Sequence, residues 1–281
     1  MAETPPKGDR TAGSPVQSCP EKTENIIIIG SELSYDSFWL KMMFMSCGIG
    51  LGKGSLMPPG WGVADKTTVL YCRSGYVRHE LLAVEALRDR FGHELVAISS
   101  PATVTARMST RVHQGDRYKI NHLAIFSHGT PGAIRLEYPR RSGDLTFSTF
   151  ASVPSDVFCP SGSIISYACN TAYAETGPSL AQRLATHFGV TVKAFDGLTN
   201  YGHCLRASAQ SASITTAMKA ATKGGSVINI SSEHEGLPHD GLGGWGAWRE
   251  GTQDYALWRK AAARGLPVQH PGSGNGMRDY R

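Results

Sequence analysis

The sequence NHLAIFSHGT at residues 121–130 and the sequence SGSIISYACNTA at residues 161–172 decide the fold. Each is a short apolar run that stops on a reactive side chain, His128 in the first and Cys169 in the second. A short apolar run bounded by polar or small residues predicts a strand that is buried on both faces. Ligands collect at the carboxyl ends of the strands of an open parallel sheet. We therefore expect the imidazole and the thiol to lie side by side at one edge of a sheet.

Strands and helices alternate on both sides of these two stretches. Apolar runs predict strands at residues 25–30, 67–72, 94–99, 119–127, 163–168 and 190–195. Helical spacing of apolar residues predicts helices at residues 34–47, 78–91, 101–113, 146–157 and 178–188. Weaker patterns add a helix at 209–221, a strand at 226–231 and a helix at 253–263. The alternation predicts an α/β fold with a mostly parallel sheet and right-handed crossovers.

Composition divides the chain into four parts. Residues 1–24 are rich in Pro, Gly, Ser, Thr and charge and are expected to be disordered. Residues 25–65 form an N-terminal extension or pro-segment, whose glycine-rich loop GIGLGKGSLMPPGWG does not match the phosphate-binding pattern. Residues 66–265 are the main domain, and residues 266–281 are a flexible tail.

Charge and cysteine usage narrow the class of protein. The 281 residues carry a net charge of +5, and the basic residues are scattered, so no nucleic-acid partner is expected. The six cysteines show no CxxC spacing, which favours reduced thiols over a disulfide scaffold or a structural zinc site. No apolar segment predicts a signal peptide or a membrane span. The expected location is the cytoplasm, with export that needs no cleaved signal left open.

Histidines outside the two strand ends are weaker candidates for function. His122 lies on the same strand face as His128 and is expected to be a strand-start or core histidine and not a ligand. The sequence SEHEGLPHD contains His234 and His239 but lacks the HExxH pattern of zinc proteases. No metal or other cofactor is therefore expected.

The pairing of His128 with Cys169 predicts nucleophilic catalysis. A cysteine attacks as the thiolate, and a nearby imidazole lowers the thiol pKa or accepts its proton. The backbone amides of Gly129 and Cys169 lie where they would hold a developing oxyanion. Taken singly, Cys169 reads as a small core residue and His128 as a turn residue. Their joint placement at successive strand ends favours catalysis.

The motifs FSHG at residues 126–129 and YACN at residues 167–170, with the His and Cys 41 residues apart, resemble those of the caspase-like cysteine peptidases. This group includes caspases, metacaspases, gingipains, separase and the self-cleaving peptidase domains of bacterial toxins. The resemblance covers roughly residues 66–201. It implies a three-layer sandwich, an endopeptidase activity for residues 66–265, and a role as an effector, a toxin or a regulated protease. It also implies a protein or peptide substrate and a regulatory or inhibitory protein partner.

The resemblance also assigns roles to individual residues. It implies that Cys169 attacks the scissile carbonyl, that His128 is the acid and base, and that the pair needs no third carboxylate. By position, Arg73, Tyr167 and Asp196 would form the specificity pocket. Arg73 would pair with an acidic substrate side chain and Asp196 with a basic one. The run Ile165–Ala168 lacks the Gln of caspases and the Asp of metacaspases before the nucleophile. The resemblance therefore does not decide which substrate side chain is preferred before the scissile bond.

Two other functions compete with the peptidase. An acyl hydrolase of the α/β-hydrolase type would need a histidine after the nucleophile, and His203 and His234 are the candidates. The sequence around Cys169 lacks the glycines of the nucleophile elbow in that fold. The other alternative is an interaction module in which the His–Cys pair is present but idle.

Overall fold

The computed structural model describes residues 19, 21–34, 41–76, 78–201, 265–270 and 272–281. The elements predicted at residues 209–221, 226–231 and 253–263 lie outside these ranges, as do His203, His234 and His239. No helix in the described ranges is both long and apolar enough to cross a membrane.

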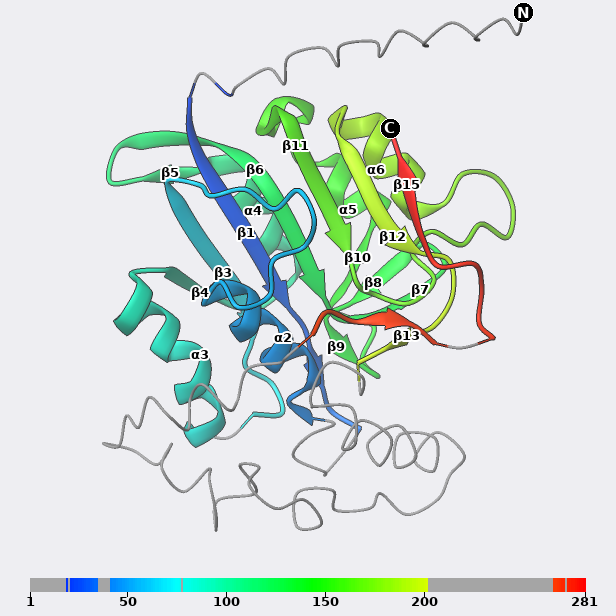
Figure 1. The fold of residues 1–281 in the computed structure, drawn as a ribbon, viewed down its shortest axis with the longest axis horizontal. Helices are drawn as coiled ribbons and strands as arrows, with labels where there is room; N and C mark the ends of the chain where they lie inside the picture. Colours follow the sequence, from blue (N-terminus) through cyan, green and yellow to red (C-terminus); the bar gives the residue numbers. More distant parts are fainter. Residues whose placement is uncertain (1–18, 20, 35–40, 77, 202–264, 271) are drawn as a thin grey trace, which may run out of the picture.

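A mostly parallel sheet forms the centre of the fold (Figure 1). Its strand order is β15–β12–β11–β6–β1–β3–β4, and β5 pairs with β6 beside this path. The strands are β1 Lys22–Ile29, β3 Lys66–Cys72, β4 Glu94–Ile98, β5 Val112–His113, β6 Asp116–Phe126, β11 Phe158–Ser166, β12 Thr191–Phe195 and β15 Met277–Tyr280. Only β5 and β15 run antiparallel to their partners. Strands form at all six predicted positions, and their apolar residues are largely buried in five of them, whereas in β4, at the edge of the sheet, only Ile98 is buried.

Helices cover both faces of the sheet. On one face lie α2 (Met43–Gly52) and α3 (Arg78–Phe91), and on the other lie α4 (Pro101–Thr110), α5 (Phe147–Ala151) and α6 (Leu180–Phe188). Alternate residues of β1 feed the two cores, with Ile27 and Ile29 in the first and Ile26 and Ile28 in the second. The fold is therefore a three-layer α/β sandwich, as the sequence predicts.

Short strands follow the carboxyl ends of the long ones. They pair as β2 (Ser31–Glu32) with β9 (Glu137–Tyr138), β7 (His128–Thr130) with β8 (Ala133–Arg135), β8 with β10 (Asp144–Thr146), and β13 (Thr199–Asn200) with β14 (Val268–Gln269). In Figure 1 β9 and β13 lie below the edge toward which β1, β6 and β11 point, and β7 and β8 lie beside that edge. This edge carries the candidate site.

The predicted boundary at residue 66 does not divide the structure. β1 lies between β3 and β6, at the centre of the sheet, so this strand belongs to the same sheet as the strands of the predicted main domain. The glycine-rich segment also differs from the predicted loop, because α2 continues through Gly48 to Gly52. A Cβ on Gly48 would lie 2.2 Å from Cδ1 of Ile29, so this glycine lets the helix pack closely on the sheet.

The two ends of the chain also differ from the sequence prediction. Residues 277–280, predicted as part of a flexible tail, form the edge strand β15 beside β12. Cys19 forms a disulfide with Cys159, which corrects the prediction of reduced thiols. The two cysteines are 140 residues apart in the chain, and spacing patterns in a sequence do not report a contact of that kind.

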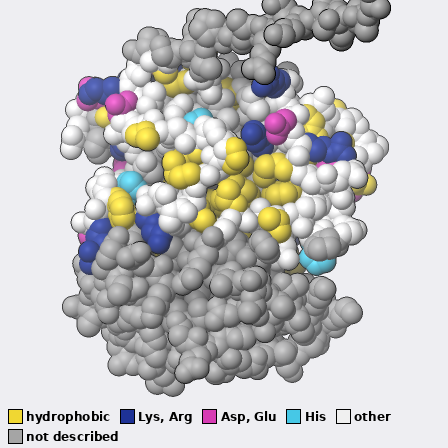
Figure 2. All heavy atoms as spheres, in the orientation of Figure 1, with side chains coloured by type: hydrophobic (Ala, Val, Ile, Leu, Met, Phe, Trp, Pro, Cys, Tyr) yellow, Lys and Arg dark blue, Asp and Glu magenta, His cyan; other side chains and the backbone are white. Residues whose placement is uncertain are grey.

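Figure 2 shows basic side chains scattered over the face it presents, and not gathered in one stripe. Hydrophobic side chains gather on the same face over the carboxyl-terminal part of the central strands. On this face the basic side chains are thus as scattered as they are in the sequence.

His122 is a buried core residue, as expected, and makes stability depend on pH. Its Nδ1 lies 2.8 Å from Oγ of Ser163, and its ring stacks on Trp61 with centroids 5.2 Å apart. Burial lowers the pKa of His122 from 6.5 to about 4. Between about pH 6.5 and pH 4 the imidazole binds a proton in the unfolded chain but stays neutral in the folded chain. Lowering the pH therefore favours unfolding.

We expect the free energy of unfolding to fall by about 3 kcal/mol between pH 7 and pH 4 through this residue alone. The loss begins near pH 6.5 and is complete near the folded pKa of about 4. Urea unfolding at a series of pH values measures it, with His122→Gln as the control. An equally steep acid loss in His122→Gln would show that other groups cause it.

Candidate active site

Three neighbouring strands each deliver one reactive side chain to the same edge of the sheet. β1 is followed by β2, which carries Glu32. β6 is followed by β7, which begins at His128, and β11 ends three residues before Cys169. Because β1, β6 and β11 are adjacent and parallel, their carboxyl ends meet there. A carboxylate, an imidazole and a thiol therefore come from three consecutive positions in the sheet.

The imidazole of His128 is held on three sides. Its Nε2 is hydrogen-bonded to Oε2 of Glu32, whose side chain is completely buried. The ring of Phe44 meets it edge-on at 4.8 Å between centroids, and the ring of Tyr138 lies 4.6 Å away. β2 pairs with β9 so that Glu32 lies opposite Tyr138, which fixes the carboxylate and one of these rings together.

Glu32 is the member of the site that the sequence analysis missed. The resemblance implies a dyad with no third carboxylate, and the composition of the sequence places residues 25–65 outside the main domain. A signal was nevertheless present, because Glu32 follows the apolar run NIIIIG as His128 follows its own strand. What the sequence alone did not show is that β1 lies next to β6.

Gly129 brings the second and third strand ends into contact. A Cβ on Gly129 would lie 2.3 Å from the carbonyl oxygen of Cys169 and 2.8 Å from its nitrogen. Such an approach is open only to glycine, so the residue after His128 packs directly on the backbone of Cys169. The amides of Gly129 and Cys169 remain the predicted oxyanion donors.

We expect Gly129→Ala to lower any activity of the site by at least about tenfold, because the added methyl must push the Cys169 backbone away from His128. Steady-state kinetics measure the loss, and thermal unfolding shows whether the fold survives. Gly132→Ala, in the turn after β7, is the matched control, since a Cβ there meets no atom within 4 Å. Because Gly132 has a φ of 85°, its variant also reports the cost of strain alone. Equal activity in the wild type and Gly129→Ala would show that this contact is not needed.

A tight turn fixes Cys169. Asn170 has a φ of 58°, a left-handed conformation that Asn tolerates better than most residues. The backbone amide of Asn170 donates to the carbonyl of Gly197 at 2.9 Å, and the side-chain hydroxyl of Thr171 donates to the carbonyl of Ala168 at 3.1 Å. The Cys169 sulfur accepts a hydrogen bond from the amide of Thr199 at 3.1 Å.

The thiol of Cys169 is neutral in this arrangement. Burial raises the pKa of Cys169, and the hydrogen bond from Thr199 opposes this only in part. The thiol therefore keeps its proton at neutral pH and needs a base in order to attack a substrate. Cys47 and Cys72 are buried, whereas the side chain of Cys169 is only partly so, and burial raises the pKa of Cys72 to about 12.

The three predicted specificity residues lie in different surroundings. The ring of Tyr167 is buried in the core and stacks on Phe126 with centroids 4.9 Å apart, so it is not presented to a substrate. Arg73 is exposed at the end of β3, and β1 separates that strand from β6. Asp196 lies at the end of β12, next to β11, and its carboxylate is bound by Arg278 at 2.6 Å.

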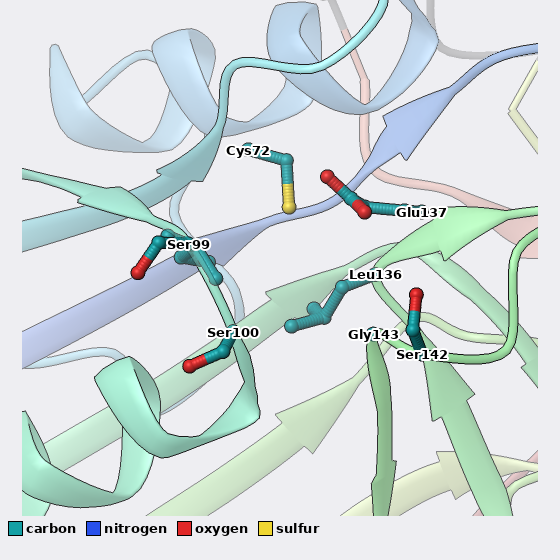
Figure 3. A pocket seen from close by; sticks show the side chains of 8 residues that line it. Cys72, Ser99, Ser100, Leu136, Glu137, Ser142 and Gly143 are labelled. Carbon is teal, nitrogen blue, oxygen red and sulfur yellow. The ribbon is translucent and has the colours of Figure 1, made fainter.

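Two hollows lie near the carboxyl ends of the strands. A groove of about 400 Å³ lies between the turn after β7 and the turn after Cys169, and Asp196 is among the residues that line it. A smaller cavity of about 170 Å³ lies beyond β3 and β4, where Cys72 and Glu137 face the same space (Figure 3). Asn170, which follows Cys169 in the chain, lines the first hollow, and Cys72, which precedes Arg73, lines the second. No cluster of three His, Cys, Asp or Glu side chains suited to a metal ion occurs in the part of the chain that the structure describes.

One protein family matches part of the chain. It is described as a domain of unknown function (DUF4347), and the match covers residues 79–204. This span contains His128 and Cys169 but ends well short of Glu32 on the N-terminal side. No curated protein matches the chain, and no solved structure matches it. The chain is thus similar over residues 79–204 to a family whose function is unknown.

Proposed function

We propose that the protein is a cysteine endopeptidase in which Cys169 is the nucleophile, His128 the acid and base, and Glu32 the residue that positions His128. One observation carries this proposal: three adjacent parallel strands end in a carboxylate, an imidazole and a thiol, with the first two hydrogen-bonded. Nucleophile, base and orienting group are the three parts that such catalysis needs.

The reaction begins with transfer of the Cys169 proton to His128 as the sulfur attacks the carbonyl carbon of the peptide bond. A carbon–sulfur bond forms, and the amides of Gly129 and Cys169 receive the oxyanion. The imidazolium then returns the proton to the leaving nitrogen as the carbon–nitrogen bond breaks. Water, deprotonated by the same imidazole, hydrolyses the thioester and restores the thiol.

Glu32 supports the proton transfer in two ways. It accepts a hydrogen bond from Nε2 of His128, which leaves Nδ1 as the nitrogen that takes the thiol proton. Its buried charge also stabilises the imidazolium that forms during attack. The amide of Ser34 donates to the other oxygen of Glu32, so the carboxylate itself is held in place.

The raised pKa of Cys169 favours a mechanism in which the thiol loses its proton during attack over one that starts from a preformed thiolate. A thiol that keeps its proton at rest reacts only when the base removes the proton during attack. The same observation is the best support for the alternative of an idle interaction module, in which the proton never leaves. Peptide turnover distinguishes the two functions, because only the peptidase cleaves a substrate.

The test combines turnover with chemical mapping of the thiols. The full chain is incubated with a peptide library, the cleaved bonds are identified by mass spectrometry, and the reaction is repeated after graded alkylation with iodoacetamide. We expect activity to fall in proportion to alkylation of Cys169, with the buried Cys47 and Cys72 as internal references. Cleavage that persists when Cys169 is fully alkylated, or no cleavage of any peptide, would contradict the proposal.

A further inference from the structure

The groove that Asn170 lines has largely uncharged walls. Pro131 follows β7, Asn170 follows Cys169 directly, and Leu198 precedes the residue whose amide donates to the sulfur. Leu198 is apolar and is 50% exposed. Tyr173, which carries an apolar ring with a polar hydroxyl, is 46% exposed. A substrate side chain that enters this groove therefore meets apolar surface on the segments that carry Cys169 and Thr199, whose amide donates to the sulfur.

The one ionised side chain among the groove residues is already paired with a cation of the protein. Asp196 is buried, and its Oδ2 accepts a hydrogen bond from Nε of Arg278 at 2.6 Å. Its Oδ1 accepts one from the amide of Asn275 at 2.8 Å. Although burial raises the pKa of Asp196, the hydrogen bonds from Arg278 and Asn275 more than offset it and hold the pKa below its ordinary value. The carboxylate is thus ionised and fully engaged within the protein.

The sheet holds Arg278 in this position. Arg278 lies on β15 opposite Ala194 of β12, two residues before Asp196, so strand pairing fixes its backbone. Ser273 and Gly274, which precede β15, line the groove as well. The C-terminal segment therefore supplies both a wall of the groove and the cation that neutralises it.

We propose that this groove takes an uncharged, apolar side chain of a peptide substrate, and that Arg278 sets this preference by occupying the carboxylate of Asp196. The proposal rests on the proposed peptidase function, and it replaces the sequence-based expectation that Asp196 binds a basic side chain. A basic side chain would have to displace a cation that is already hydrogen-bonded, whereas an apolar one needs no such exchange.

The test measures binding, so that it does not depend on turnover. All variants carry Cys169→Ala in the full chain, and the probes are fluorescein-labelled alanine hexapeptides with Leu, Lys or Glu at each position in turn. We expect the Leu peptide to bind about tenfold more tightly than the Lys peptide at one position. Fluorescence anisotropy gives both dissociation constants.

Three further substitutions test the role of Arg278. Arg278→Gln should raise the affinity for Lys relative to Leu by about tenfold, because it frees the buried carboxylate, and adding Asp196→Asn should cancel the gain. Arg278→Lys keeps the charge and should keep the preference for Leu. Asp196→Asn alone keeps β15 but frees the arginine, so it should raise the affinity for Glu. Thermal unfolding shows which variants keep the fold.

The possible outcomes are distinct. A preference for Lys that Asp196→Asn abolishes, equal binding of all peptides, or no binding would each overturn the inference. If the wild type cleaves nothing but the Cys169→Ala protein still prefers Leu, the peptidase proposal fails and the groove proposal holds. If the wild type cleaves beside basic residues, the peptidase proposal holds and the groove proposal fails.

Discussion

Replacement of His128 by alanine is expected to lower kcat/KM for peptide cleavage by about 10³-fold or more. The physical reason is the neutral thiol: burial raises the pKa of Cys169, so without a base almost no thiolate forms at neutral pH. The loss should appear in kcat, because His128 acts on the proton in the transition state and not on substrate binding. Steady-state kinetics with one defined peptide measure it.

His187→Ala is the matched control for this variant. His187 is another partly buried histidine, whose Nε2 lies 2.9 Å from the carbonyl oxygen of Val153, on the face of the sheet that α6 covers. Its variant should lose little activity. Equal losses in both variants, or retention of most activity in His128→Ala, would show that His128 is not the base.

Replacement of Glu32 by glutamine is expected to lower kcat by about 10²-fold and to change KM little. Glutamine keeps the size of the side chain but removes the negative charge that stabilises the imidazolium. It also offers an amide nitrogen that can reverse the hydrogen bond to His128 and so favour the wrong tautomer. The split between kcat and KM distinguishes this positioning role from a general loss of structure.

Glu137→Gln provides the comparison for Glu32. Glu137 is a partly buried carboxylate that accepts a hydrogen bond from Ser74, and it lies on β9, the partner of β2. It lines the smaller cavity (Figure 3). We expect its activity to stay within a few-fold of the wild type. A Glu32→Gln enzyme as active as Glu137→Gln would remove Glu32 from the mechanism.

The sequence predicts the layers of the fold well, because buried parallel strands are continuous apolar runs. The run Ile26–Ile29 and the runs before His128 and Cys169 all lie in the sheet where their periodicity places them. Strand order is a different matter, since it depends on which runs lie side by side. The placement of β1 between β3 and β6 follows from packing across the whole sheet.

The same distinction explains the candidate site. His128 and Cys169 stand out in the sequence because each ends an apolar run of its own strand. Glu32 becomes visible only when β1 is known to neighbour β6. Asp196 is hydrogen-bonded to Arg278, which lies 82 positions later in the chain. A local sequence pattern around Asp196 therefore does not reveal that its carboxylate is already bound.

The most direct test of the central claim is to trap the acyl-enzyme. The wild type is mixed with a peptide ester, the reaction is quenched in acid during the first turnover, and the tryptic peptides are examined by mass spectrometry. The proposed mechanism predicts an acyl group on the sulfur of Cys169, and its absence in Cys169→Ala and in His128→Ala. Product formed with the acyl group on another residue, or with Cys169 unmodified throughout, would contradict it.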